Sequence, residues 1–159
     1  MSAESDLIDR FYTAFQHRDW AAMAACYHAE VEFSDPVFTH LQGRQPAAMW
    51  HMLLESASEL SVSFSAVEGA DGRGGANWVA VYPFSQTGRL VQNRIQASFE
   101  FRDGLIWRHC DQFDLWAWTR MALGPMGLLL GWTPFLRNKV RKMAAYRLSR
   151  FIDKHTEYR

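Results

Sequence analysis

The stretch from residue 60 to residue 115 constrains the fold most, because it predicts four successive strands joined by short turns. Apolar and polar residues alternate along the first of these, LSVSFSAVE, over residues 60–68. The predicted strands that follow cover residues 78–85, 90–101 and 105–115. The turns between them read DGRGG, QTG and RDG, and the last contains the Asp-Gly pair typical of a tight hairpin. Connections this short join antiparallel neighbours, so the stretch predicts an antiparallel sheet.

Helices precede this sheet. Apolar residues recur at helical spacing over residues 7–15, with Ser2 or Ser5 as a candidate N-cap, and Asp19 can cap a second short helix. A short strand over residues 31–33 stops at Asp35-Pro36, and Pro46 suits the first turn of a third helix. The order predicts an α+β fold in which a curved antiparallel sheet wraps over the N-terminal helices.

Composition narrows the classes of function. The chain has 159 residues, and its 17 basic and 17 acidic residues balance, which gives no reason to expect a nucleic-acid partner. No apolar run reaches the ~18 residues of a membrane span, and the N-terminus lacks a signal-peptide pattern, so we expect a cytoplasmic protein. Neither a dinucleotide-binding nor a P-loop motif occurs, so no cofactor is expected.

No metal site is predicted either. The sequence contains no HxH, HxxxH or carboxylate cluster. We expect His28, His40 and His51 to lie at the surface or at a pocket rim, without an acidic or histidine partner at ligand spacing.

Two segments carry a family resemblance. They are IDRFYTAFQHRDW followed by CYHAEVEFSDPVF, and FEFRDGLIWRHCDQFDLW. With the order of elements, they resemble the nuclear transport factor 2-like superfamily, which includes ketosteroid isomerases, SnoaL-like polyketide cyclases and limonene epoxide hydrolases. The resemblance covers roughly residues 5–118. It implies a cone-shaped domain over residues 1–118 with an extension over 119–159, and a homodimer that forms through the sheet.

Neither of two known catalytic sets is complete. Asp35 falls where the ketosteroid isomerases keep their general base, but Phe11 and Ala97 replace their oxyanion-binding Tyr and acid. For the epoxide hydrolases, Asp111 matches the aspartate of the final strand. Their essential Arg and Asp fall on Trp78 and Ala80, and their water-holding Tyr and Asn on Phe33 and Asp35.

A different constellation remains. Trp107, His109 and Asp111 alternate along the last strand, and the resemblance implies that their face points into the cone, opposite Asp35. The three predicted catalytic residues are therefore Asp35, His109 and Asp111. Asp35 or Asp111 would be the base, and His109 would be a proton partner or an electrophile. The predicted pocket lining comprises Phe11, Phe33, Trp50, Trp78, Asn93, Ala97 and Trp107. In the alternative reading, Asp35 is a turn residue and His109 is a satisfied interior histidine.

The C-terminal extension departs from the family. Residues 121–136 carry no charge, and their glycines and prolines argue against one continuous helix. Residues 137–159 hold eight basic and two acidic residues and predict a helix with one apolar side. We expect either an apolar loop that closes the cone or packs on a partner subunit, or an anchor to anionic membrane.

Three functions follow from these observations. The first is a SnoaL-like enzyme that performs isomerisation, cyclisation or hydration on a small apolar molecule, without a cofactor. The second is a non-catalytic binding protein that uses the same cavity. The third is a dimeric assembly module.

Overall fold

The computed structural model describes residues 2–159. The helices are α1 (Ala3–Gln16), α2 (Trp20–Ala25), α3 (Gln45–Ser56), α4 (Leu115–Leu123), α5 (Pro125–Leu130), α6 (Pro134–Lys154) and the 3-10 helix η1 (Thr156–Tyr158). The strands are β1 (Tyr27–Ser34), β2 (Leu41–Gln42), β3 (Ser61–Ala70), β4 (Arg73–Pro83), β5 (Leu90–Arg102) and β6 (Leu105–Gln112). The α+β prediction is confirmed.

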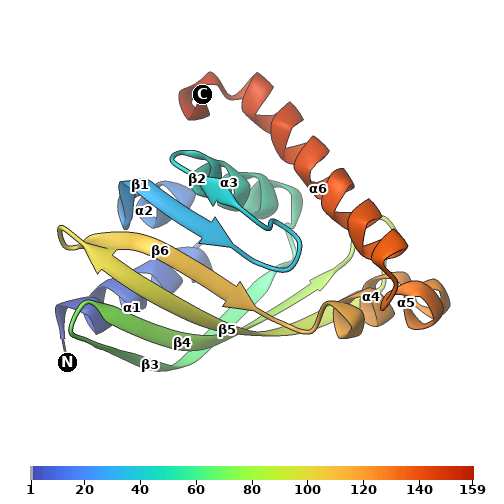
Figure 1. The fold of residues 1–159 in the computed structure, drawn as a ribbon, viewed down its shortest axis with the longest axis horizontal. Helices are drawn as coiled ribbons and strands as arrows, with labels where there is room; N and C mark the ends of the chain where they lie inside the picture. Colours follow the sequence, from blue (N-terminus) through green and yellow to red (C-terminus); the bar gives the residue numbers. More distant parts are fainter. Residues whose placement is uncertain (1) are drawn as a thin grey trace.

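One curved sheet organises the molecule. Its strand order is β2-β1-β6-β5-β4-β3, and every neighbouring pair is antiparallel except β1 with β6. The helices α1, α2 and α3 lie on one face of this sheet, and α6 runs across its open end (Figure 1). The side chains between the helices and the sheet form one apolar core.

The predicted caps explain where the first helices begin. The Ser2 side chain accepts a hydrogen bond from Ser5 N, and the Ser5 side chain accepts one from Ser2 N, which makes a reciprocal capping box. Asp19 caps α2 through Ala22 N. Pro46 occupies the first turn of α3, as predicted.

Several details of the strands differ from the predictions, among them the start of β1 at Tyr27 rather than at residue 31. The first hairpin turn is only Asp71-Gly72, because residues 73–75 already pair in β4. A bulge at Ala66, where φ is 54°, breaks the alternation of β3. Strand β6 ends at Gln112 rather than residue 115, because the Asp114 carboxylate accepts from Ala117 N and starts α4.

The C-terminal extension is helical, and the predicted basic helix is α6. Residues 121–136 form no continuous helix, as expected, but they form short helical segments rather than one apolar loop. Helix α4 ends at Gly124, whose φ of 66° favours glycine, and Pro125 opens α5. Helix α6 then packs against α3, with Leu148 buried in the main core. Among the helices of residues 2–159, none has both the length and the apolar character that crossing a membrane requires.

Candidate functional site

A cavity of about 490 Å³ lies between the concave side of the sheet, α3 and α6. Most of its wall is apolar or aromatic, with Trp50 from α3, Trp78 from β4 and Trp118 from α4. Helix α6 supplies one side through Leu136, Val140 and other residues. The cavity therefore suits an apolar molecule, and the C-terminal extension forms part of its wall.

Asp35 is the acid of this wall, on the loop that follows β1. Its Oδ1 accepts hydrogen bonds from Val37 N at 2.7 Å and from Phe38 N at 2.6 Å. Burial, with a smaller contribution from the charge of the nearby Asp111 carboxylate, raises the pKa of Asp35 to about 7 against the effect of these two bonds. The residue is half-buried and lines the cavity. A carboxyl group with this pKa can both accept and donate a proton at neutral pH.

The Asp35 loop reconciles two predictions. The residue does make the Asx-type turn expected of Asp-Pro, since its carboxylate binds the backbone two and three residues on. All of these bonds go to Oδ1, so within residues 2–159 the second oxygen, Oδ2, remains for a ligand. The turn thus fixes the orientation of the carboxylate toward the cavity.

Tyr82 places a hydrogen-bond donor in the same wall. Its Oη accepts a bond of 2.8 Å from Trp118 Nε1, which leaves its own proton to donate. Burial raises the pKa of the Tyr82 phenol, as does the charge of Asp35, so the phenol is neutral at neutral pH. Asn93, also buried, lines the cavity from the adjacent strand, where it pairs with Ala80.

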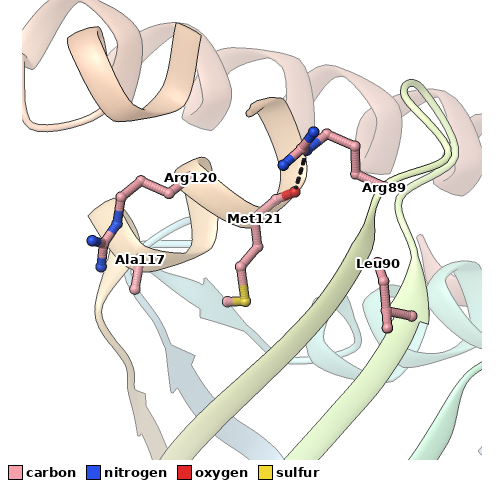
Figure 2. Close-up of a pocket in the computed structure, with 5 residues that line it drawn as sticks. All are labelled: Arg89, Leu90, Ala117, Arg120 and Met121. Carbon is pink, nitrogen blue, oxygen red and sulfur yellow. Dashed lines mark hydrogen bonds between the residues drawn. The ribbon is translucent and has the colours of Figure 1, made fainter. Parts of the chain in front are cut away.

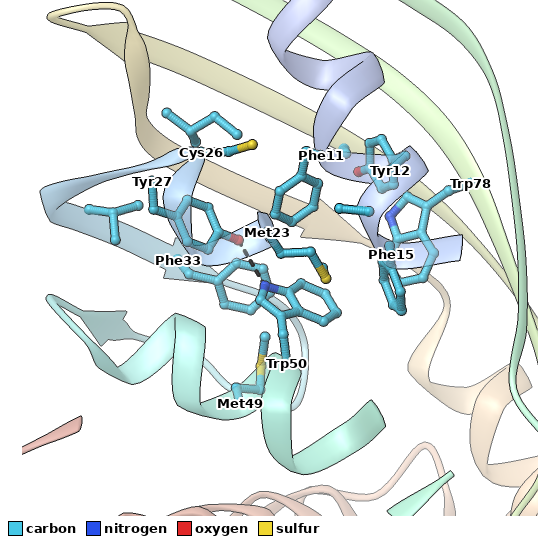
Figure 3. Packing of buried hydrophobic residues seen from close by; sticks show 14 of the residues in the cluster. Phe11, Tyr12, Phe15, Met23, Cys26, Tyr27, Phe33, Met49, Trp50 and Trp78 are labelled. Atoms are coloured by element: carbon cyan, nitrogen blue, oxygen red, sulfur yellow. Dashed lines mark hydrogen bonds between the residues drawn. The ribbon is translucent and has the colours of Figure 1, made fainter. Parts of the chain in front are cut away.

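His109 and Asp111 are brought together behind the cavity. His109 Nε2 lies 2.9 Å from Asp111 Oδ1, and His109 Nδ1 lies 2.9 Å from Tyr27 Oη. Trp50 Nε1 donates to Tyr27 Oη at 2.8 Å (Figure 3), and Trp78 Nε1 lies 3.4 Å from Asp111 Oδ1. The network therefore connects the indole N–H groups of two residues in the cavity wall.

The hydrogen-bond partners indicate which atoms of this network donate and which accept. Tyr27 Oη accepts from Trp50, so its single proton goes to His109 Nδ1, and His109 Nε2 donates to Asp111. This assignment gives both ring nitrogens of His109 a hydrogen-bond partner. Both His109 and Asp111 are buried, and neither lines the cavity. The prediction that they face the cavity beside Asp35 was therefore wrong; Trp50 and Trp78 stand in front of them.

Four predicted pocket residues lie outside the cavity wall. Phe11 and Phe33 belong to the core, where their rings pack on His109 at centroid distances of 5.5 and 4.9 Å. Ala97 is buried opposite Asp111 in the sheet. Trp107 lies between the guanidinium groups of Arg102 and Arg108, because a bulge in the β5–β6 pairing turns it away from the cone. Trp50, Trp78 and Asn93 do line the cavity.

Two tyrosines of the candidate site were not predicted from the sequence. Tyr82 could have been found, because it continues the period-two series of Trp78 and Ala80 along β4. Tyr27 could not, because the β1–β6 register shifts between Tyr27 and Glu32. The expectation that His28 and His51 have no acidic partner was also wrong. The Nε2 of His28 lies 3.1 Å from Asp103 Oδ2, and the Nε2 of His51 lies 3.1 Å from Glu55 Oε2, one helical turn on.

A second hollow lies on the outer surface, between Leu90 on β5 and Met121 on α4 (Figure 2). It is open, and its polar side chains are Arg89 and Arg120. Arg89 Nε donates to Met121 O at 2.9 Å. With no carboxylate, histidine, hydroxyl or thiol side chain in its lining, this hollow lacks the groups for acid–base or nucleophilic work.

Solved structures share this fold at low identity. TerC, co-crystallised with polyporic acid, superposes with a TM-score of 0.65 and 17% identity over 76% of this chain and 98% of TerC. A protein provisionally assigned as a polyketide cyclase from Xanthomonas campestris gives 0.63 and 23%, over 75% of this chain and 96% of its own. A LEH-like epoxide hydrolase from Mycobacterium tuberculosis gives 0.61 and 17%, over 81% and 96%.

At the level of sequence, no curated protein matches the chain. The profile of the SnoaL-like domain matches residues 8–109, which is nearly two thirds of the length. This range runs from α1 to the middle of β6 and includes Asp35, Trp50, Trp78, Tyr82 and Asn93. The chain therefore belongs to the SnoaL-like family.

Proposed function

We propose that this SnoaL-like protein is an enzyme that moves a proton next to a carbonyl group in a small apolar molecule. The observation that carries the proposal is Asp35, whose carboxyl group has a pKa of about 7 and faces an apolar cavity. Structures named as polyketide cyclases and as a ketosteroid isomerase share the fold, which agrees with chemistry of this class.

The reaction assigns one role to each polar group in the wall. The Asp35 carboxylate takes a proton from the carbon next to the carbonyl, and the electron pair of the C–H bond moves into the carbonyl group. The resulting enolate oxygen accepts hydrogen bonds from the Tyr82 hydroxyl and the Asn93 amide. Asp35 then returns its proton to a carbon of the enolate, which completes an isomerisation. Alternatively, the enolate carbon attacks a second carbonyl of the same molecule, and the alkoxide oxygen formed there takes the proton from Asp35, which completes a cyclisation.

In this scheme His109 and Asp111 are positioning residues. They hold Trp50 and Trp78 in the cavity wall through hydrogen bonds to the indole N–H groups, one of them by way of Tyr27. Asp111 also raises the pKa of Asp35 by charge repulsion. This role differs from the direct proton transfer expected of both residues.

The experiment measures proton exchange and needs no knowledge of the natural product. A panel of apolar ketones and enones is incubated with the protein in D₂O, and deuterium at the carbons next to the carbonyl is followed by NMR. We expect exchange above background for at least one member. Asp35→Asn is expected to abolish it, and Tyr82→Phe to slow it about 10²-fold. The exposed Asp9→Asn serves as the control.

A non-catalytic binding protein is the second candidate, and the mostly apolar and aromatic lining of the cavity favours it. In that case, apolar ligands protect the protein against thermal unfolding, yet none exchanges its protons faster than in buffer. Protection that persists in Asp35→Asn, without exchange in the unmodified protein, would replace the enzyme by this alternative.

A further inference from the structure

Most of the exposed large apolar side chains of residues 2–159 lie at α5 and the turn after it. Leu129 is 68% exposed, Trp132 61% and Phe135 74%. We call residues 126–135 the apolar tip; its other exposed members are Met126, Leu128 and Leu130. The tip lies at one end of the molecule, away from the sheet (Figure 1). Contiguous exposed apolar surface of this kind marks a site that another surface covers.

Glycines hold the tip in this exposed arrangement. Gly127 and Gly131 approach Thr119 of α4 so closely that a Cβ at either position would overlap it. The Thr119 hydroxyl also lies 3.3 Å from Gly127 O. Because α5 is packed this tightly on α4, its leucines cannot turn inward. The exposure of the tip side chains therefore follows from the packing of α5 on α4.

The surroundings of the tip are basic. Residues 115–152 contain seven Lys and Arg and no Asp or Glu. Phe135, Lys139, Lys142, Tyr146 and Arg150 are all exposed and recur every three or four residues along one face of α6. A second copy in a symmetric contact would place these charges against each other, whereas an anionic lipid surface complements them.

The cavity opens at the border of this surface. Met126 of the tip and Met143 of α6 are exposed, and both also line the cavity, as does Lys139. An apolar molecule that leaves a bilayer beside the tip would reach the cavity without crossing water. We propose that the tip inserts into the interface of an anionic membrane, so that the cavity exchanges its apolar ligand directly with the lipid phase.

Membrane docking is inferred from the exposed apolar and basic side chains alone. The exchange of ligand with the lipid phase rests on the proposed function. Vesicles of phosphatidylcholine with 30% phosphatidylglycerol are sedimented with the protein at low salt, and pure phosphatidylcholine vesicles are the comparison. We expect binding to the anionic vesicles that weakens at least tenfold in 0.5 M salt or with Leu129→Glu. Leu90→Glu, at a leucine that is 66% exposed on β5, is the matched control and should bind normally.

The outcomes separate the two proposals. Failure of the unmodified protein to bind, or equal binding by Leu129→Glu, would overturn membrane docking. A dimer that Leu129→Glu dissociates would instead assign the tip to a second copy. Asp35→Asn should bind vesicles like the unmodified protein, and Leu129→Glu should exchange protons of a soluble ketone normally, so loss of either activity is read independently.

A separate cluster joins α3 to the C-terminal end of the chain. His51, Glu55 and His155 each offer one ligand atom, and these three atoms lie within 4.8 Å of one another. His51 Nε2 and Glu55 Oε2 are 3.1 Å apart. Two nitrogen ligands and one oxygen ligand at Zn²⁺ bond lengths of about 2.0–2.2 Å are themselves ~3.3 Å apart, so a small closure would complete the set.

The outer hydrogen bonds of both rings suit metal binding. His155 Nδ1 lies 3.0 Å from Phe151 O, which can only accept, so Nδ1 carries the proton and Nε2 offers its lone pair. His51 Nδ1 lies 2.9 Å from Tyr158 Oη, so Nε2 is the nitrogen that faces Glu55. We infer that this trio binds a divalent transition-metal ion such as Zn²⁺ and fixes the end of α6 to α3.

Calorimetry with Zn²⁺ tests this second proposal. We expect one site per chain, an affinity that falls at least tenfold in His155→Ala and in Glu55→Gln, and an unchanged affinity in the exposed control His40→Ala. Zn²⁺ should also raise the unfolding temperature of the control but not of His155→Ala. Binding that is absent, or equal in all variants, would overturn it.

Discussion

Asp35→Asn should make the protein more stable, and by an amount that grows with pH. Asn keeps an oxygen that can accept the bonds from Val37 N and Phe38 N, so the turn survives. It cannot ionise, however. In the unmodified protein the folded state holds a carboxyl group whose pKa is about 7, whereas in the unfolded chain this pKa returns toward 3.8.

The sign and size of this change in stability follow from the difference in proton binding between the folded and unfolded states. Between pH 3.8 and about pH 7 the folded state binds more protons than the unfolded state, so the free energy of unfolding falls as pH rises through this window. The full difference corresponds to about 4 kcal/mol at 1.36 kcal/mol per pH unit. This value is an upper bound, because the side chain faces the cavity and is not fully enclosed by protein. Between pH 5 and pH 8 we expect the advantage of Asp35→Asn to grow by about 2 kcal/mol.

Urea denaturation of both proteins at pH 5, 6, 7 and 8 measures this difference. Asp9→Asn, at an exposed position of α1, controls for the general effect of removing one negative charge. If the two stability curves for Asp35→Asn and the unmodified protein run parallel, Asp35 has an ordinary pKa and the account of the site is wrong.

Three further outcomes are expected. Tyr27→Phe leaves Trp50 Nε1 and His109 Nδ1 buried without partners and should cost about 2–4 kcal/mol in urea unfolding, against less than about 0.5 kcal/mol for the exposed Tyr146→Phe. Leu148→Ala removes the buried anchor of α6 and should cost about 2–4 kcal/mol, with faster amide exchange in α6 than in the sheet. Carbon-proton exchange by the unmodified protein should rise with pH and level off above about pH 7, because the base must be ionised; a flat profile would exclude Asp35 as that base.

The fold was largely predictable because its signals are local. The Asp103-Gly104 turn has positive φ at both residues, and the Ser2 and Asp19 caps are short-range hydrogen bonds. The alternation of β3 predicted a strand but not its bulge at Ala66, since a bulge depends on the neighbouring strand.

The site was predictable only in part. Period two correctly placed His109 and Asp111 on the inner face of β6, but counting back through the bulge misplaced Trp107. His109 and Asp111 lie behind Trp50 and Trp78, which separate them from the cavity. This arrangement depends on how α3 and β4 pack, and the spacing of residues along one strand cannot predict it. The place of α6 in the cavity wall likewise depends on its contact with α3. Dimerisation through the sheet stays a prediction.

The central claim is that an ionisable carboxyl group faces an apolar cavity with its pKa near neutrality. Carbon-13 NMR of the aspartate side-chain carboxyl groups, assigned to Asp35 by loss of its signal in Asp35→Asn, measures this pKa directly. The account predicts a midpoint of about 7, with a further change when an apolar ketone fills the cavity. A midpoint near 3.8 would show that solvent reaches Asp35 freely, and would contradict its role as the acid–base group.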